Sequence, residues 1–98
     1  PLQAGRLRAL LDPRLLPLPW RLRPRRAGDR FWPLGQPHEL ELRRFLQSRH
    51  VPRFDRDRLP LLVDAQDRIL WIPGVEVAEP ARLHLNTRRC VEVVAHCG

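Results

Sequence analysis

Arginines and aromatic residues are interleaved in one irregular stretch of the chain, at Arg26, Arg30, Phe31 and Trp32. Guanidinium groups bind phosphates, and a ring beside them can stack on a base or pack against a sugar. The alternative is that the arginines are solvated and the rings pack in the core, because buried aromatics anchor most small domains. We favour phosphate contact for the two arginines and packing for the two rings.

A second pair, Arg43 and Arg44, lies beside an apolar seam with helical spacing, so we expect both side chains to face solvent. Glu39 and Glu41 precede them and could form ion pairs with them, each worth only about 0.3 to 0.5 kcal/mol. A solvated helix face and a nucleic-acid contact fit this pattern equally well. We expect the two carboxylates to weaken the contribution of this pair to any anion-binding surface.

A third group, Arg53, Arg56 and Arg58, lies in a charged segment that follows the predicted helix. Asp55 and Asp57 alternate with these arginines, so local pairing could neutralise much of the charge. The predicted helix connects the first arginine segment, residues 26–32, to this one, residues 53–58. The two segments could therefore form a single phosphate-binding patch.

Side chains that bind metals or act as nucleophiles gather late in the chain, at His84, Cys90, His96 and Cys97. There is no Cys-x-x-Cys pair, and the odd separation of the cysteines places them on opposite faces of an alternating strand. This disfavours a disulfide and a zinc site. No third group is apparent that would orient a Cys-His catalytic pair. We predict reduced cysteines, no metal site and no catalytic residue in this chain.

The charge balance favours a polyanionic partner. All 18 basic residues are arginine, 11 residues are acidic and the formal net charge is +7. Nucleic acid ranks ahead of an acidic membrane, and the alternative is a domain whose charge only prevents association. No apolar run approaches the roughly 18 residues that span a bilayer, and no secretory or transit segment is visible. We expect a cytoplasmic protein without a membrane partner.

The first part of the chain contains one helix-like and one strand-like segment. Leucines at helical spacing in residues 5–12 predict a short helix that Pro13 ends. Residues 18–23 alternate, which predicts a half-buried strand. Its leucines and tryptophan should face the core, and Arg21 and Arg23 should face solvent.

One main helix is predicted over residues 37–50, where Leu42, Phe45 and Leu46 form the apolar seam. Pro52 ends it. The seam needs an apolar partner, so we expect it to pack against a sheet.

Strand signals dominate the second half of the chain. The apolar runs 59–63 and 69–72 are joined by a polar loop and predict a hairpin, and further alternating segments occur at 75–77, 83–85 and 91–95. These elements predict an α+β fold, a small mostly antiparallel sheet packed with one main amphipathic helix. The sheet residues expected against the helix seam are Leu61, Val63, Leu70 and Ile72.

The central part of the chain resembles the C-terminal domain of bacterial tRNA(Ile)-lysidine synthetases. The likeness covers residues 18–92 and rests on an ordered set of short motifs with compatible gaps. The motifs are Arg26 with Gly-Asp-Arg-Phe (28–31), Pro-Leu-Gly (33–35), Leu-Arg-Arg-Phe-Leu (42–46), Val-Pro-Arg (51–53), Arg-Asp-Arg-Leu-Pro-Leu-Leu-Val-Asp (56–64) and Ile-Leu-Trp-Ile-Pro-Gly (69–74).

The resemblance implies an ATP-dependent ligase that activates an anticodon cytidine of tRNA(Ile) and couples lysine to it. The family's pyrophosphate loop, Ser-Gly-Gly-x-Asp-Ser, belongs to an N-terminal catalytic domain, and the glycines of this chain are scattered singly. The chain should therefore hold no cofactor and catalyse nothing alone, since ATP and lysine are used by the catalytic domain. The implied partners are tRNA(Ile) and the protein's own N-terminal catalytic domain.

On this interpretation, residues 18–98 are the C-terminal tRNA-binding domain, and residues 1–17 are a linker or the remnant of a preceding domain. The chain lacks methionine and begins at Pro1, so we expect it to be a piece of a longer protein. The alternative function is an interaction module that docks on its own catalytic domain and has little RNA affinity. The predicted RNA-binding residues are Arg26, Arg30, Arg43, Arg44, Arg53, Arg56 and Arg58.

One departure from the family concerns the start of the predicted helix. Family members tend to carry lysines just ahead of the leucine that opens the seam, whereas this chain has Glu39, Leu40 and Glu41 before Leu42. Two carboxylates there would repel a phosphate, which argues against phosphate binding at the start of this helix.

Overall fold

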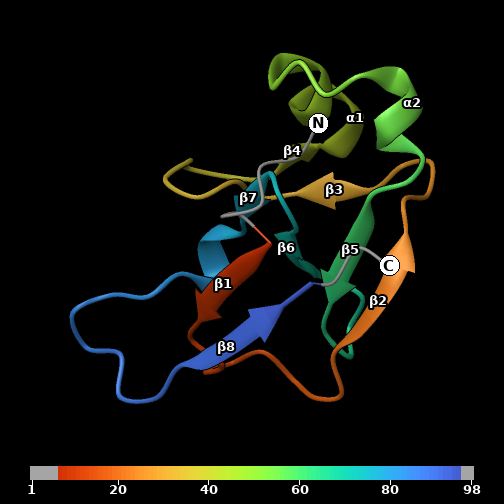
Figure 1. The fold of residues 1–98 in the computed structure, drawn as a ribbon. Coiled ribbons are helices and arrows are strands. Elements are labelled where there is room, and N and C mark those ends of the chain that lie inside the picture. Colours follow the sequence, from red (N-terminus) through yellow and green to blue (C-terminus); the bar gives the residue numbers. More distant parts are fainter. Residues whose placement is uncertain (1–6, 96–98) are drawn as a thin grey trace.

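The computed structural model describes residues 7–95 and has a four-stranded antiparallel sheet at its centre (Figure 1). In spatial order its strands are β2 (Arg21–Pro24), β5 (Pro60–Val63), β6 (Ile69–Ile72) and β7 (Glu76–Val77). β5 and β6 are the predicted hairpin. Nearly all of their residues are buried, because other layers cover both faces of the sheet.

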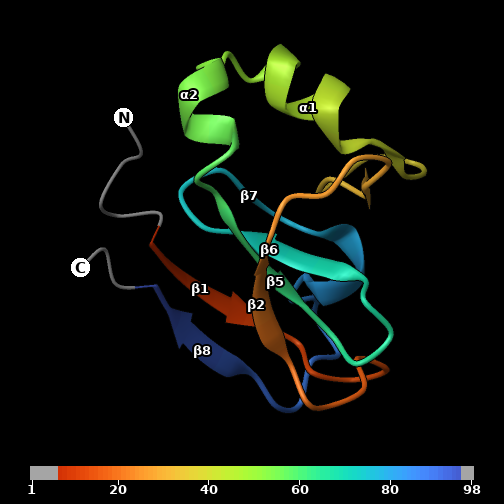
Figure 2. The same cartoon turned by 90° about the vertical axis from the view of Figure 1, so that its right-hand side faces the viewer.

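One face of the central sheet is covered by α1 (Leu42–Ser48) and by a short ribbon of β3 (Arg30–Phe31) and β4 (Leu40–Glu41). A single helical turn, α2 (Arg53–Arg56), follows α1 and leads into β5. Figure 2 shows both helices together on one side of the sheet.

The other face is covered by a two-stranded antiparallel ribbon of β1 (Arg8–Leu11) and β8 (Val91–Val94). A short 3₁₀ helix, η2 (Glu79–Ala81), follows β7 and contributes the buried Ala81 to this side. The fold is α+β with mostly antiparallel sheets and one main helix, as predicted.

The apolar seam of α1 packs on the central sheet as predicted. Leu42, Phe45 and Leu46 are each at most 5% exposed and belong to a helix-side cluster that also contains Phe31. The rings of Phe31 and Phe45 lie 5.0 Å apart, centre to centre. The sheet residues of this cluster include Leu61, Val63, Ile69 and Ile72.

Leu70 packs on the opposite face of the sheet from the one predicted. Leu62 pairs with Trp71 and Val63 pairs with Ile69, so Leu70 has no residue opposite it in β5. An extra residue of this kind is a β-bulge and interrupts the alternation of side chains along the strand. Leu70 and Trp71 therefore both join a ribbon-side cluster, beneath β1 and β8.

The helix predicted in residues 5–12 is wrong, because the described part of that segment forms strand β1. Ala9 and Leu11 are buried while Leu10 is 47% exposed, which is the alternation of a strand. The leucine spacing is compatible with a helix, but pairing with β8 from the far end of the chain decides the outcome. The division of the chain at residue 17 stays a prediction, although Leu16 is also buried in the ribbon-side cluster.

Three further boundaries differ from those predicted. The main helix occupies only the later part of the predicted range 37–50, since residues 40–41 pair with β3. The charged segment 53–58, for which no helix was predicted, contains α2. Residues 83–85, predicted to alternate as a strand, form none and lie in the loop that leads to β8.

The strand predicted for residues 18–23 is present in part as β2, and Trp20 just before it packs against the ribbon-side cluster as predicted. The predicted orientation is wrong for the two leucines and for Arg23. Leu18 and Leu22 are 75% and 59% exposed, whereas Arg23 is 6% exposed. Arg21, two residues earlier, is exposed as predicted.

The buried Arg23 binds two carboxylates, that of the mostly buried Asp29 and that of the exposed Asp67. Its terminal nitrogens donate to the two side-chain oxygens of Asp29 at 2.8 and 3.1 Å, and its Nε donates to Asp67 at 2.9 Å. Burial raises the pKa of Asp29, but hydrogen bonds from Arg23 and from the backbone N–H of Arg26 outweigh it and hold that pKa below its usual value. The hydrogen bonds to Asp29 raise the pKa of Arg23. This network ties β2 to the following loop and to the β5–β6 turn.

The packing of the seam predicts a large loss of stability for Phe45→Ala. The substitution opens a cavity beside Phe31 and should lower the free energy of unfolding by about 3 to 5 kcal/mol. Phe54→Ala is the matched control, because the ring of Phe54 is 65% exposed, and it should cost less than about 1 kcal/mol. Urea denaturation followed by circular dichroism measures both. Equal losses from the two variants would contradict the packing.

The buried network predicts different effects for two arginines on one strand. Arg23→Ala leaves Asp29 charged with its side chain only 11% exposed, and should lower the free energy of unfolding at pH 7 by about 3 to 5 kcal/mol. Arg21→Ala is the control, since Arg21 bonds to the same Asp67 at 3.0 Å with its side chain 49% exposed, and should cost about 0 to 1 kcal/mol. Similar losses for both variants would contradict a special role for Arg23.

The same pair predicts a pH dependence. Because the pKa of Asp29 is lowered from 3.8, the pair stabilises the fold fully above that pH, and its contribution disappears as pH falls through the lowered pKa. The stability difference between the parent and Arg23→Ala should therefore shrink in urea titrations below pH 3.8. A difference that stays constant across this range would show that the lost stability does not come from the charge of Asp29.

Candidate nucleic-acid interface

The loop after β2 carries Arg26 and is held in place by Asp29. A side-chain oxygen of Asp29 accepts the backbone N–H of Arg26 at 2.8 Å, and the Asp29 carbonyl accepts the N–H of Leu42 at 2.9 Å. Gly28 has a φ of +85°, a left-handed conformation that glycine adopts without strain. This turn is fixed to the start of α1 and, through Arg23, to β2.

A cavity of about 310 Å³ lies between this loop and the start of α1. It brings Arg26 and Arg43 together, and Arg25 also lines it. The carboxylates of Asp29 and Glu41 are part of the lining, but Asp29 is already bound by the buried arginine. The Nε of Arg25 is buried and has no hydrogen-bond partner within the described residues. The cavity therefore has a mixed lining of three arginines and two acidic residues, and each of the three arginines is paired with a carboxylate.

Three of the predicted arginines hold carboxylates in ion pairs at the surface. Their side chains are 53–69% exposed, so each pair contributes only about 0.2 to 1 kcal/mol and a phosphate can replace the carboxylate. Glu39 and Glu41, which precede α1, were expected to pair with Arg43 and Arg44. Only Glu41 pairs with an arginine of α1, and Glu39 pairs with Arg30. The pairs are Arg26 with Asp67 at 3.4 Å, Arg30 with Glu39 at 3.3 Å and Arg43 with Glu41 at 3.0 Å.

The other four predicted arginines, Arg44, Arg53, Arg56 and Arg58, form no ion pair with a carboxylate in the part of the chain that the structure describes. Arg44 and Arg53 are exposed. Arg56 donates from Nε to the carbonyl of Val51 at 2.8 Å, so part of its role is to fix the turn between the helices. Local pairing within residues 53–58, the alternative that the sequence left open, does not occur.

A residue that the sequence did not single out connects the two arginine segments. Arg25 donates to Asp57 at 2.8 Å, which ties the loop after β2 to the residue that follows α2. Arg26 and Arg43 meet at one cavity, while Arg58 lines a neighbouring cavity of about 300 Å³ with Leu22.

The exposed ring with an arginine over its face is Phe54, and not one of the two aromatic residues, Phe31 and Trp32, that the sequence singled out. Phe31 is 1% exposed and lies in the helix-side cluster, so it packs in the core as favoured. Trp32 is 37% exposed, and its Nε1 donates to the carbonyl of Gln36 at 2.7 Å. Phe54, which sequence reasoning missed, is 65% exposed with the guanidinium carbon of Arg58 4.1 Å from its ring centre. Its one sequence signal is a lone aromatic residue within a charged segment.

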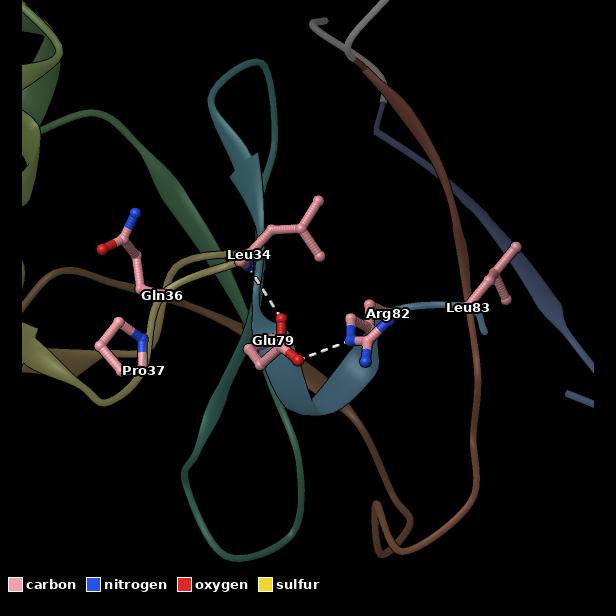
Figure 3. A pocket seen from close by; sticks show the side chains of 7 residues that line it. Leu34, Gln36, Pro37, Glu79, Arg82 and Leu83 are labelled. Carbon is pink, nitrogen blue, oxygen red and sulfur yellow. Dashed lines mark hydrogen bonds and ion pairs between the residues drawn. The ribbon is translucent and has the colours of Figure 1, made fainter. Parts of the chain in front are cut away.

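A larger cavity, of about 620 Å³, lies beside η2 (Figure 3). Glu79 accepts the N–H of Gly35 at 2.8 Å and the Nε of Arg82 at 2.5 Å, and the Gly35 bond above all lowers the pKa of Glu79. Leu34 and Leu83 line the cavity and are 41% and 39% exposed. The lining of this cavity combines apolar residues with the paired Glu79 and Arg82, and includes none of the predicted RNA-binding arginines.

The residues considered for metal binding are only partly described. Cys90 is exposed and its thiol is free, and the Nε2 of His84 lies 3.3 Å from Asp12. His96 and Cys97 lie outside the described residues. Within residues 7–95 no three His, Cys, Asp or Glu side chains are grouped as a metal site. None of the helices in this range has the length and apolar character of a membrane span.

Comparison with known proteins gives concordant matches. A family model described as the TilS substrate C-terminal domain matches residues 20–92. The tRNA(Ile)-lysidine synthase of Symbiobacterium thermophilum is 45% identical over 83 residues, which are 85% of this chain and 17% of that protein. For the enzyme of Geobacillus kaustophilus the identity is 40% over 74 residues, 76% of this chain and 16% of that protein.

A solved structure agrees with these matches. The crystal structure of a TILS C-terminal domain has a TM-score of 0.73 and 32% sequence identity to this chain, and the match covers 97% of this chain and 75% of that one. The chain spans about a sixth of the length of the two relatives. The family model includes every arginine of the predicted interface. The chain belongs to the TilS substrate C-terminal domain family.

Proposed function

We propose that this domain binds tRNA(Ile) and positions it for the catalytic part of a tRNA(Ile)-lysidine synthase. The observation that carries the proposal is the group of four predicted arginines on and around α1 and α2 that have no carboxylate partner within the described residues. Guanidinium groups left uncompensated at a surface attract a polyanion, and the family match specifies which polyanion to test.

The mechanism is substrate positioning through the RNA backbone. Phosphate contacts supply affinity and orientation without reading the sequence, so tRNA identity would come from shape and from joint binding by two domains. In this proposal the catalytic part of the protein uses ATP and lysine, and this chain supplies no catalytic group.

The ion pairs divide the interface into two classes of arginine. Arg44, Arg53 and Arg58 can bind a phosphate without giving up a carboxylate. Arg26, Arg30 and Arg43 must first release one. The exposed pairs are weak, so this exchange costs little. The unpaired class should contribute most to affinity. The sequence predicted that Glu39 and Glu41 would weaken phosphate contacts by Arg43 and Arg44. In the structure these carboxylates pair with Arg30 and Arg43, so we expect the weakening at those two arginines and not at Arg44.

A second candidate function is docking on the rest of the parent protein. The cavity beside η2 favours it, because Leu34 and Leu83 are exposed there around the anchored carboxylate of Glu79. Apolar side chains rimmed by polar groups are typical of protein contacts. Mixing the chain with a separately purified catalytic part tests it, and a stable complex that forms without RNA and is lost in Leu83→Asp supports it.

The arginine surface predicts a specific salt dependence. In the full 98-residue chain, Arg53→Ala should weaken tRNA(Ile) binding and flatten the plot of log affinity against log salt by about 0.7 to 0.9 units, one phosphate contact. Arg88→Ala is the matched control, because Arg88 is also exposed and forms no ion pair within the described residues but lies before β8. It should leave the slope unchanged.

Fluorescence anisotropy across a salt series measures both variants, and circular dichroism confirms that each is folded. If both variants lose the same affinity and slope, binding depends on net charge and the assignment to α1 and α2 fails. If neither variant differs from the parent, docking on the catalytic part becomes the better account.

A further inference from the structure

We propose that the exposed ring of Phe54 and the guanidinium of Arg58 form a site for an unpaired nucleobase of an RNA strand. This inference rests on the proposed function and deepens it. The arginine surface would bind paired and unpaired RNA alike through phosphates, whereas an exposed ring accepts only a base that is free to leave its stack.

Phe54 is not required by the core. Its ring is 65% exposed and belongs to neither apolar cluster, while Phe31 and Phe45 are each at most 5% exposed. α2, the turn that carries it, buries none of its residues. A single exposed apolar side chain is common on protein surfaces, so the argument depends on what surrounds this ring.

Arg58 gives the ring a fixed cationic neighbour. Its guanidinium carbon lies 4.1 Å from the centre of the Phe54 ring, a cation–π contact that orders both groups. Arg58 also lines a cavity of about 300 Å³ that includes Leu22, Pro24 and Leu59, and Leu22 is 59% exposed. Arg58 therefore contacts the aromatic face of Phe54 and also lines a cavity with four apolar residues, Arg23 and Asp57. Aromatic faces and planar cations are surfaces on which bases stack.

The charges around the ring favour a strand of nucleic acid over a protein partner. Arg53 and Arg56 flank Phe54 in sequence and have no carboxylate partner in the described chain. Asp57 is bound to Arg25, which leaves Asp55 as the uncompensated acid of this segment. A base on the ring would place its own phosphates next to these arginines, so stacking and charge act on the same nucleotide.

The test compares two RNAs and two variants of the full chain. One RNA is a short duplex with an unpaired adenosine tail, and the other is a blunt duplex with the same number of phosphates. Phe54→Leu keeps an apolar side chain without an aromatic face, and Phe54→Trp keeps the face. Phe54→Leu should bind the tailed duplex roughly five- to a hundredfold more weakly and the blunt duplex as the parent does, with an unchanged salt slope. Phe54→Trp should bind both RNAs as the parent does.

Each other outcome is distinct. If the parent binds neither RNA, the proposed function fails and this site with it. If the parent binds both RNAs and Phe54→Leu binds the tailed duplex equally well, the base site alone is overturned. An equal loss for both RNAs would also overturn it, because the ring would then only support the arginines. If Phe54→Leu weakens only a complex with the catalytic part of the enzyme, Phe54 is a protein contact.

Discussion

Arg23 holds two carboxylates from segments that are distant in sequence, Asp29 in the loop after β2 and Asp67 in the β5–β6 turn. The guanidinium is well suited to this role, because its donors are fixed in one plane and bind Asp29 with two parallel hydrogen bonds. Because Arg23 and Asp29 are largely buried, their remaining donors and acceptors must be satisfied, and Asp29 also accepts the N–H of Arg26. The buried side chain of Arg23 thereby helps to fix the loop after β2, which carries Arg26.

The central sheet is covered on both faces, and its two middle strands contribute no arginine to the predicted interface. β5 and β6 offer almost no exposed side chain, and the β1–β8 ribbon shields the face away from α1. The bulge at Leu70 makes this possible, because it turns two adjacent residues of β6 toward the ribbon while Ile69 and Ile72 remain toward the helix. The arginines of the predicted interface lie on the loops, on β3 and on the short helices of the α1 side.

Local patterns predicted the elements whose partners are near in sequence. The seam of α1 and the β5–β6 hairpin follow from spacing and composition alone, and the family motifs identified the domain. The strand β1 could not be found in this way, because only pairing with β8 decides between strand and helix for its leucines. The burial of Arg23 could not be predicted either. Alternation gives the period of a strand, but it does not show which side chains a network of charged residues will bury. Which arginines keep their charge uncompensated depends on pairs such as Arg25 with Asp57, and no local pattern contains them.

The pairing of β1 with β8 has a consequence for the order of folding. Arg8 lies opposite Val94, so this ribbon closes a loop of nearly the whole described chain and can form only after all of it is available. The helix-side cluster, by contrast, uses only residues between Phe31 and Ala78, so it spans a shorter part of the chain. Short-range contacts form before long-range ones in small domains. During synthesis, the half of the domain that displays the arginines would therefore assemble first, and the ribbon would close over its back as the final step.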